Sequence, residues 1–327
     1  MRTPLTIVIP TFNGRQHLET CLPAVRRHAP ERTQVLVVDD CSSDGTLEWL
    51  KVAHPWVERL QTPTNLGFCG AVNLGIEHSR GDVVELLNND TTVAAGWCEA
   101  ALRHFADPKV GSVAPLTLMM DHPTHIDSAG QEYHLVGWAR NIGYGQELAR
   151  FPLRRGEVFG ASGCSGFYRR SLLLELRGLL PEYGAYFEDT DLAFRIRWAG
   201  YRCIFEPDSR VYHKGSASYG GQPDRLVQLI SRNEELVFWI NLPTAQLVVG
   251  LLPHLGFQCV RAVRKALSGQ FGPYLRGKLQ ALGLARRIAA RRRELRSLGK
   301  RSPDLSLTAS PRVLQQGVVW LRARKCA

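Results

Sequence analysis

Residues 83–93 read VVELLNNDTTV, an apolar run that ends abruptly in two amides and a carboxylate. The first five residues are typical of a buried β-strand, because four of them are Val or Leu. Asn88, Asn89 and Asp90 are typical of a turn, since their short side chains hydrogen-bond to nearby backbone. A turn alone would explain them, so their meaning depends on where this strand ends in the fold.

The chain before this strand alternates between strand and helix patterns. Apolar runs at residues 5–10 and 34–40 predict strands, and a short strand is expected near residues 57–61. The segments that follow the runs have apolar residues at helical spacing. Such alternation predicts βαβ units. We therefore expect an α/β fold with a Rossmann-like, mainly parallel sheet that is flanked by helices.

The predicted strands end in polar residues. Thr11 and Asn13 follow the first strand, Asp39 and Asp40 end the second, and NND follows the strand at 83–87. Ligands of such sheets bind beyond the carboxyl ends of the strands. We therefore expect these polar residues to gather at one site. Turns and helix caps are the alternative explanation for each of them taken separately.

The composition is that of a folded globular protein, with 44% hydrophobic and 22% charged residues. The eight Cys are scattered and include no CxxC pair. This pattern argues against a disulfide framework and a structural zinc site, and it favours a reducing cytosol. The first residues, MRTPLTIVIPTFNG, contain too short an apolar run for a secretory signal peptide.

Charge divides the chain into two parts. Residues 1–224 contain 22 Lys and Arg against 26 Asp and Glu, whereas residues 225–327 contain 19 against 4. The difference divides a mildly acidic body, residues 1–224, which we expect to be one domain, from a strongly basic region, residues 225–327, which we expect to be helical. The excess positive charge therefore concerns the partner of the C-terminal region rather than the main fold.

The C-terminal region has features of a membrane-associating segment. Residues 236–260 are mainly apolar but contain Pro243 and Pro253, so helices lying on a membrane surface fit them better than a spanning helix. Residues 282–301 place Leu and Ile on one helical face, among arginines that include residues 291–293. That pattern is typical of an interfacial helix on anionic lipid. A solvated charged helix is the alternative.

Seven stretches together resemble the inverting family 2 glycosyltransferases, and they occur in that family's order across roughly residues 5–218. They are IVIPTFNG, VLVVDDCSSDGT, NLGFCGAVNLGI, LLNND, GASGCSGFYRRSLL, YFEDTDLAFRIRWAGY and VYHKGSAS. With the IDSAG stretch at residues 126–130, the set looks most like the bacterial rhamnosyltransferase-like branch. The resemblance implies the A-type nucleotide-sugar-binding fold. It also implies transfer of a sugar from a UDP- or dTDP-sugar to a hydroxyl of a glycan acceptor, typically lipid-linked, in cell-surface polysaccharide synthesis.

The resemblance also implies which residues bind the nucleotide-sugar. Asp40 would accept a hydrogen bond from the pyrimidine N3–H, which suits uracil or thymine, and Thr11 would contact the base through its backbone. Glycines between residues 65 and 75 would let the backbone approach the ligand closely, with helix–sheet packing as the alternative. The full set implied for nucleotide-sugar binding is Thr11, Asn13, Asp40, Asn65, Asn73, Asn88 and Asn89.

A divalent ion is expected at Asp90 and His213, which resemble the family's two protein ligands. Mg²⁺ and Mn²⁺ prefer oxygen ligands, and Mn²⁺ also accepts imidazole. Asn88 stands where many relatives have an acid, which predicts weaker metal binding. Without the resemblance, His213 would be an ordinary polar residue after a strand.

The stretch YFEDTDLAFRIRWAG at residues 186–200 predicts a helix with Glu188, Asp189 and Asp191 in its first turn. By resemblance, Asp189 is the base that takes the proton from the acceptor hydroxyl, with Glu188 as its catalytic neighbour. Simple capping of the helix is the alternative. Glu188 and Asp191 would orient the acceptor or pair with Arg195, which is itself a candidate for contacting the acceptor. Gly163 would lie in a loop beside the acceptor. Residues 125–133 would shape the donor-sugar pocket or form an ordinary loop.

Two other classes of protein fit parts of the sequence. A nucleotidyltransferase would also combine such a sheet with a metal and a pyrimidine nucleotide, but IVIPTFNGR is a poor triphosphate loop. A nucleic-acid-binding or membrane-binding protein would use the net charge of +11, yet the acidic body argues against nucleic acid. We expect a cytoplasmic enzyme, peripheral to the inner face of the cell membrane, that binds an anionic membrane surface through its C-terminal region.

Overall fold

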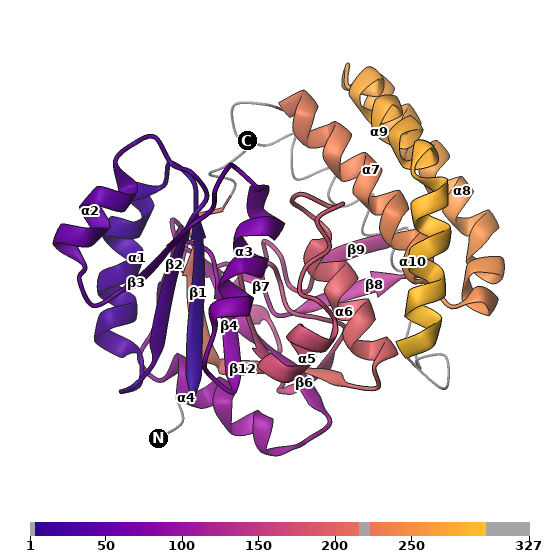
Figure 1. Cartoon of the computed structure of the whole chain (residues 1–327). Helices are drawn as coiled ribbons and strands as arrows, with labels where there is room; N and C mark the ends of the chain where they lie inside the picture. The colour runs from indigo at the N-terminus through magenta and orange to yellow at the C-terminus, as the bar shows by residue number, and fades with distance from the viewer. Residues whose placement is uncertain (1–3, 216–222, 299–327) are drawn as a thin grey trace.

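The computed structural model describes residues 4–215 and 223–298, with a central sheet, helices on both of its faces, and further helices packed at one end (Figure 1). The first part of the chain follows the expected alternation of strands and helices. Its elements are β1 (Leu5–Thr11), α1 (Arg15–His28), β2 (Gln34–Asp39), α2 (Thr46–Ala53), β3 (Glu58–Gln61), α3 (Gly67–His78) and β4 (Val83–Leu87).

The second part contains short strands, two long strands and most of the helices. Its elements are β5 (Thr91–Val93), α4 (Trp97–Leu102), β6 (Val110–Met119), β7 (Ile126–Ser128), β8 (Gln131–His134), β9 (Trp138–Asn141), β10 (Gly156–Val158), β11 (Ser165–Arg169), α5 (Arg170–Glu175), α6 (Glu188–Trp198), β12 (Arg202–His213), α7 (Pro223–Asn241), α8 (Thr244–Leu267), α9 (Phe271–Gly283) and α10 (Ala285–Leu298).

The main sheet has the strand order β10-β12-β6-β11-β4-β1-β2-β3, with β5 beside β12 and β7 beside β6. The half that contains β3, β2, β1 and β4 is parallel, as the sequence predicts. β11 is inserted antiparallel between β4 and β6, and β12 runs parallel to β6. The α/β fold is therefore confirmed, with an antiparallel strand that the alternation pattern does not show.

This topology brings many strand ends to one edge of the sheet. Because β11 is antiparallel to both of its neighbours, β4 and β6 point the same way. β12 follows the direction of β6, so the carboxyl ends of β1, β2, β4 and β12 share one edge. β11 starts there, since its first residue, Ser165, pairs with Leu87 at the end of β4. The loop before β11 therefore also reaches this edge.

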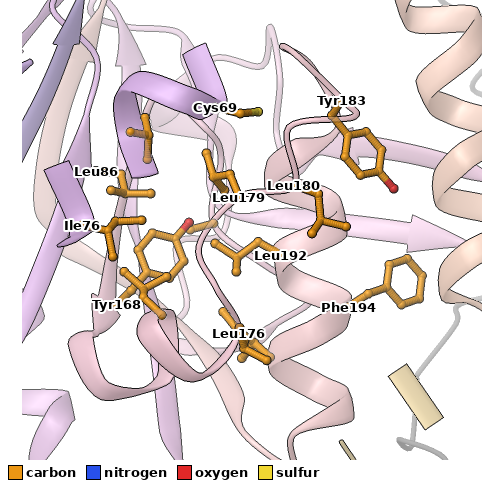
Figure 2. Packing of buried hydrophobic residues seen from close by; sticks show 14 of the residues in the cluster. Cys69, Ile76, Leu86, Tyr168, Leu176, Leu179, Leu180, Tyr183, Leu192 and Phe194 are labelled. Carbon is orange, nitrogen blue, oxygen red and sulfur yellow. The ribbon is translucent and has the colours of Figure 1, made fainter. Parts of the chain in front are cut away.

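Two apolar layers cover the two faces of the sheet. Alternate residues of β1 face opposite ways: Ile7 packs with α1 and α4, whereas Val8 packs with α3 and α6. Figure 2 shows the second layer, in which the segment between α5 and α6 fills the space between helices. There Leu179 lies between Ile76 of α3 and Leu192 of α6, all of them buried.

The basic C-terminal region is helical, as expected, but it is not separated from the sheet. Leu236, Val237 and Phe238 of α7 are buried in the same apolar layer as α3 and α6. The segment 236–260 is divided: it contains the end of α7, a break at Pro243, and the first two-thirds of α8. The division of the chain at residues 224 and 225 stays a prediction.

Candidate active site

α6 begins at the site with a strained entry. Tyr186 and Phe187 have φ of 65° and 69°, in the left-handed region that non-glycine residues seldom adopt. This entry delivers Asp189 to a cluster of donors. Its Oδ2 accepts hydrogen bonds from the Gly163 N–H and from Gln131 Nε2, both at 2.7 Å, and its Oδ1 accepts one from its neighbour's N–H at 2.6 Å.

Glu188 has different surroundings although it is adjacent in sequence. It is 6% exposed, and its Oε2 has no hydrogen-bond partner among the described residues. Burial, and then the charge of Asp189, raise the pKa of Glu188 to about 8. Burial raises the pKa of Asp189 too, against the hydrogen bonds from Gly163 and Thr190 that favour its ionised form. We therefore assign the proton at neutral pH to Glu188 and the negative charge to Asp189.

A second cluster forms around His213, the last residue of β12. Its Nδ1 lies 3.0 Å from Asp127 Oδ2, and its Nε2 lies 3.4 Å from Asp90 Oδ1. Asp127, Cys164 and His213 each bring a possible ligand atom, and these atoms lie within 4.8 Å of one another. Asp90 at Nε2 gives a carboxylate beside an imidazole, a pair that suits Mn²⁺, while Asp127 at the opposite ring nitrogen is placed to orient the imidazole.

In this cluster, Asp90 and His213 shift each other's pKa in the directions that favour their charged forms. Burial would raise the pKa of Asp90, but the hydrogen bond and charge of His213 outweigh it and lower that pKa. Burial would lower the pKa of His213, whereas Cys164 and the two carboxylates raise it. Because burial also raises the pKa of the Cys164 thiol, that group is neutral at pH 7, and Asp90 and Asp127 supply the opposing charge.

The two clusters are joined by consecutive residues of the loop before β11. Gly163 donates its N–H to Asp189, and the next residue, Cys164, belongs to the cluster around His213. The Cys164 carbonyl accepts the Asn88 N–H at 2.9 Å, which ties the loop to the NND turn. A Cβ on Gly163 would lie 3.2 Å from both Asp189 Oδ2 and Glu188 Oε1. This loop therefore has little room for a larger residue.

The loops after β1, β2 and β4 are bound to one another. Asn89 Nδ2 donates to Thr11 Oγ1 at 2.9 Å, and the Ser43 N–H donates to Asn13 Oδ1 at 2.8 Å. Gly14 allows the loop after β1 to approach the loop after β4, because a Cβ at residue 14 would lie only 2.3 Å from Asn89 Nδ2. The structure thus brings Thr11, Asn13 and Asn89 together at the expected edge.

Asp40 lies at the same edge but is already heavily hydrogen-bonded. Its carboxylate accepts bonds at 2.8 Å from Thr62 Oγ1 and from the N–H groups of Leu66 and Gly67. Asn65 Nδ2 donates to the Asp40 carbonyl at 3.3 Å. Asp40 therefore organises the loop that leads into α3, and its contact with a base stays a prediction.

Three residues of the expected set are used inside the protein. Asn73 exchanges two hydrogen bonds with the backbone of Leu179, at 2.7 and 2.8 Å. Asp191 and Arg195 are 0% and 4% exposed and form an ion pair at 2.7 Å. The expected alternative of mutual pairing is therefore what the geometry shows, and burial leaves no surface of this pair for an acceptor. Tyr183 OH and Asn241 Nδ2 complete the partners of Asp191.

The structure adds residues that sequence reasoning did not single out. Asp127, Gln131 and Cys164 contact or adjoin the two clusters, and the first two fall within the stretch 125–133 that was expected near the donor sugar. Their positions in that stretch were a usable signal, although their partners were not. Phe12 is also 53% exposed in the loop after β1, which is unusual for a large apolar side chain.

Two of the curated proteins that are similar to this chain come from Mycobacterium tuberculosis. An N-acetylglucosaminyl-diphospho-decaprenol L-rhamnosyltransferase is 28% identical over 247 residues, which cover 68% of this chain and 80% of that protein. A pre-mycofactocin glycosyltransferase is 28% identical over 292 residues, which cover 80% of this chain and 58% of that protein. The chain therefore spans most of the first relative and little more than half of the second.

Comparison with solved structures gives the same fold at lower identity. S. aureus TarS 1-349 in complex with UDP-GlcNAc has a TM-score of 0.59 and 17% identity, and the match covers 90% of both chains. The mannosyltransferase PcManGT from Pyrobaculum calidifontis, in complex with GDP-Man and Mn²⁺, has a TM-score of 0.56 and 18% identity. That match covers 86% of this chain and 88% of the other. The fold is thus that of the A-type glycosyltransferases.

The family model described as Glycosyl transferase family 2 matches residues 6–177, which is more than half of the chain. This match decides against the nucleotidyltransferase and the non-catalytic binding protein. It agrees with the fold, with the order of the seven motifs, and with a rhamnosyltransferase among the relatives. The protein belongs to glycosyl transferase family 2 and is a glycosyltransferase.

Proposed function

We propose that this chain is a metal-dependent, inverting glycosyltransferase that moves a sugar from a UDP- or dTDP-sugar to a hydroxyl of a lipid-linked glycan. The observation that carries the proposal is the loop before β11. Gly163 binds the candidate base Asp189, while Cys164 adjoins the cluster of His213, Asp127 and Asp90. The candidate base and the proposed cation site would thus be neighbours, as transfer from a sugar diphosphate requires.

Asp90 and His213 would hold Mn²⁺ or Mg²⁺, with Asp127 at the other ring nitrogen of His213 as their supporting residue. When bound, the ion supplies a Lewis acid that neutralises charge on the departing diphosphate. The proposal gains support from PcManGT, which was solved with GDP-Man and Mn²⁺. Exhaustive chelation should abolish transfer, and full activity after chelation would refute the metal assignment.

Asp189 would act as the base. Its carboxylate takes the proton from the acceptor hydroxyl while the hydroxyl oxygen bonds to C1 of the sugar and the bond from C1 to the diphosphate oxygen breaks. Attack from the face opposite the diphosphate inverts the anomeric centre. Burial raises the pKa of Asp189, which makes it a stronger base than an exposed Asp. Glu188, being protonated, leaves the negative charge on its neighbour.

The loops after β1 and β2 would bind the nucleoside. Thr11 and Asn13 are fixed there by Asn89 and Ser43, and Asp40 orders the loop before α3. We keep Asp40 as the acceptor for the pyrimidine N3–H, with uracil or thymine as the base, and assign Asn65, Asn88 and Asn89 to the same nucleotide-sugar region. Asn73 is not part of this proposed nucleotide-sugar site, because its side-chain amide is hydrogen-bonded to the backbone of Leu179.

The lipid-linked acceptor is proposed from the relative that acts as an N-acetylglucosaminyl-diphospho-decaprenol L-rhamnosyltransferase. An acceptor of that kind is held in a membrane by its polyprenol chain. The proposed enzyme would therefore work at the cytoplasmic face of the cell membrane, attached peripherally through its basic C-terminal region, in synthesis of a cell-surface polysaccharide.

The test is a titration of the purified protein with UDP- and dTDP-sugars in the presence of Mn²⁺, followed by product analysis with a polyprenyl-diphosphate-linked GlcNAc acceptor. We expect release of nucleoside diphosphate and an anomeric proton signal that shows inverted configuration at C1. Asp189→Asn should bind the donor normally and turn over about 10²–10⁴-fold more slowly, the usual contribution of a general base. Near-normal turnover of that variant, or release of pyrophosphate, would overturn the proposal.

A further inference from the structure

α8 turns its apolar side outward. Val248, Val249, Leu252, Val260 and Leu267 are 70%, 68%, 78%, 56% and 85% exposed. They recur at helical spacing, so they form one stripe along the length of the helix. In a helix that only supports a soluble fold, such a stripe faces the core.

The opposite side of α8 carries polar groups that are bound by the rest of the protein. His254 is 1% exposed, with Nδ1 at 2.8 Å from the Val136 carbonyl and Nε2 at 3.3 Å from Glu235 Oε2. Arg261 pairs with Glu234, which is itself 1% exposed. Turning the helix over would leave these buried acids without their partners, which is costly. The outward direction of the apolar stripe is therefore fixed by the inward ion pairs.

α9 repeats this arrangement and packs against α8. Phe271, Leu275, Leu279 and Leu282 are 42%, 42%, 57% and 70% exposed and follow one another at helical spacing. Lys278 borders this stripe, and its Nζ turns back to the protein and reaches Glu235 Oε1 at 2.7 Å. Two neighbouring helices thus direct charge inward and apolar side chains outward. We name these exposed apolar side chains of α8 and α9 the outer face.

The helices that carry the outer face, together with α10, are strongly basic. Residues 244–298 contain eleven Lys and Arg and a single acidic residue, Glu294. Arg276, Arg286 and Arg287 are exposed. An occupant must therefore offer apolar matter together with negative charge, and an anionic lipid bilayer offers both.

We propose that the outer face lies in the interface of an anionic membrane, with the exposed arginines among its headgroups. This inference rests on the peripheral membrane attachment in the proposed function and assigns it to particular helices. By length and composition, α8 is the one helix of the described residues that could cross a membrane. The contact of His254 with Glu235 and the ion pair of Arg261 with Glu234 hold it against the protein, so it lies along the membrane surface instead.

The arginines of α10 for which the sequence predicts lipid contact are instead bound within the protein. Arg291 pairs with Glu182 at 3.1 Å and with Glu294 at 2.7 Å. Arg292 donates to the carbonyls of Trp239 and Leu242, at 2.7 and 2.9 Å. Replacing this pair would damage the fold as well as any lipid contact. The outer face, by contrast, can be changed without breaking any internal bond.

The outer face is coupled to the candidate base through α7. Asn241, at the end of α7, donates to Asp191 Oδ1 on α6 at 2.8 Å, and α8 begins three residues later. Asn233 Nδ2 donates to the carbonyls of Tyr183 and Tyr186 in the segment that leads into α6. A membrane bound at the outer face would thus lie at a fixed position relative to Asp189, as an acceptor anchored in lipid requires.

The test uses the full-length protein and vesicles of phosphatidylcholine with or without 30% phosphatidylglycerol, an anionic fraction chosen on the order of that in charged natural membranes. Flotation should show binding to the anionic vesicles. The double variant Leu252→Ser with Leu267→Ser should bind them about tenfold or more weakly, since two apolar side chains are lost from the interface. Its control, Val52→Ser with Leu174→Ser, removes exposed apolar side chains of α2 and α5 and should bind like the wild type.

Activity separates this inference from the proposed function. The outer-face variant should turn over a short, water-soluble GlcNAc-diphosphate acceptor at the wild-type rate and a vesicle-bound polyprenyl acceptor more slowly. If the protein transfers no sugar at all but the variant still loses vesicle binding, the proposed function fails and this inference stands. Equal vesicle binding by wild type and variant overturns it. A dimer that the variant dissociates, without vesicle binding by the wild type, also overturns it and assigns the outer face to a second copy of the chain.

Discussion

Glu188 and Asp189 are adjacent in sequence, but their surroundings differ, and this difference decides which of the two carboxyl groups is protonated. Asp189 is bound by the N–H groups of Gly163 and Thr190 and by Gln131, whereas Glu188 Oε2 has no partner among the described residues. A carboxylate is favoured where donors converge, and a neutral acid is favoured where they do not. The difference explains how two adjacent acids at a helix N-terminus can have separate roles.

The pKa of Glu188 predicts a pH-dependent contribution to stability. Its folded-state pKa of about 8 lies above the ordinary value of 4.5, so the folded state holds the proton more tightly. The stabilising contribution is complete below about pH 4.5 and is lost as the pH rises through about 8, by up to about 1.4 kcal/mol per pH unit. Glu188→Gln lacks this titration, so its stability relative to the wild type should rise between pH 5 and pH 9.

Chemical unfolding at pH 5, 7 and 9 measures this difference. Glu85 is the control, because burial raises its pKa to about 8 as well, while Trp97 and Ser165 donate hydrogen bonds to it. The double variant with Glu85→Gln should lose more of the pH dependence than either single variant. A stability difference between Glu188→Gln and wild type that is constant over this range would show that Glu188 is ionised in the fold.

Asp127 is the residue from which we expect the clearest effect on the metal. It contacts His213 Nδ1 at 3.0 Å, so it either orients the imidazole or joins the ion directly. Asp127→Asn should weaken Mn²⁺ binding about 10–100-fold, the usual effect of such partners. Electron paramagnetic resonance of free Mn²⁺ measures this without a donor or turnover. Asp121→Asn, an exposed carboxylate on the same connection, should leave binding unchanged; equal affinities of the two variants would remove Asp127 from the site.

At the scale of elements, α7 acts as a clamp on the segment that leads into α6. Asn233 is fully buried, and its Nδ2 faces the carbonyls of Tyr183, Ala185 and Tyr186, at 2.8–2.9 Å. These contacts hold Tyr186 and Phe187 at positive φ, a conformation that costs energy and must be stabilised by its surroundings. The geometry of Asp189 therefore depends on a helix far from it in sequence.

Two substitutions of Asn233 should rank in a defined order. Asn233→Ala removes the donor and should destabilise the fold by about 1–3 kcal/mol, the cost of leaving buried carbonyls unpaired. Asn233→Asp should cost more, because a carboxylate oxygen would face those same carbonyls. Hydrogen exchange of residues 183–190 should rise in the same order, with turnover falling more than donor affinity. If the Asp variant matched the wild type, the clamp would have no role in placing Asp189.

The sequence allows the parallel half of the sheet to be predicted, because β1, β2 and β4 are mainly apolar and helical patterns follow β1, β2 and β3. β3 itself is a short polar strand, Glu58–Gln61. It does not indicate β11, since residues 160–171 are rich in Gly and Ser, and their strand is fixed by pairing with β4 and β6. The site divides in the same way. The distant pair Asp90 and His213 follows from the motifs, whereas Asp127 lies in the three-residue strand β7, whose place is set by tertiary contacts.

At the scale of the molecule, the acidic body and the basic region are joined by a shared core. Phe238 of α7 lies in the same buried layer as Leu192 of α6 and Val72 of α3. α10 is attached to this region too, because Arg292 binds carbonyls at the end of α7. The charge boundary in the sequence is therefore not a boundary in packing, and the positive charge is carried by helices that depend on the sheet for their position.

This shared core predicts that α7 unfolds together with the sheet. Segments that bury apolar surface in one layer open at the same free energy, whereas α8, with most of its apolar residues exposed, should open locally at a lower one. Native-state hydrogen exchange at rising denaturant measures both. The opening free energies of amides in residues 234–240 should converge with those of residues 83–87 as denaturant rises. Amides of residues 248–263 should open at a lower free energy. If residues 234–240 opened well before the strand at 83–87, the C-terminal region would be an independent domain, and the clamp on the catalytic segment would not be stable enough to hold Asp189 in place.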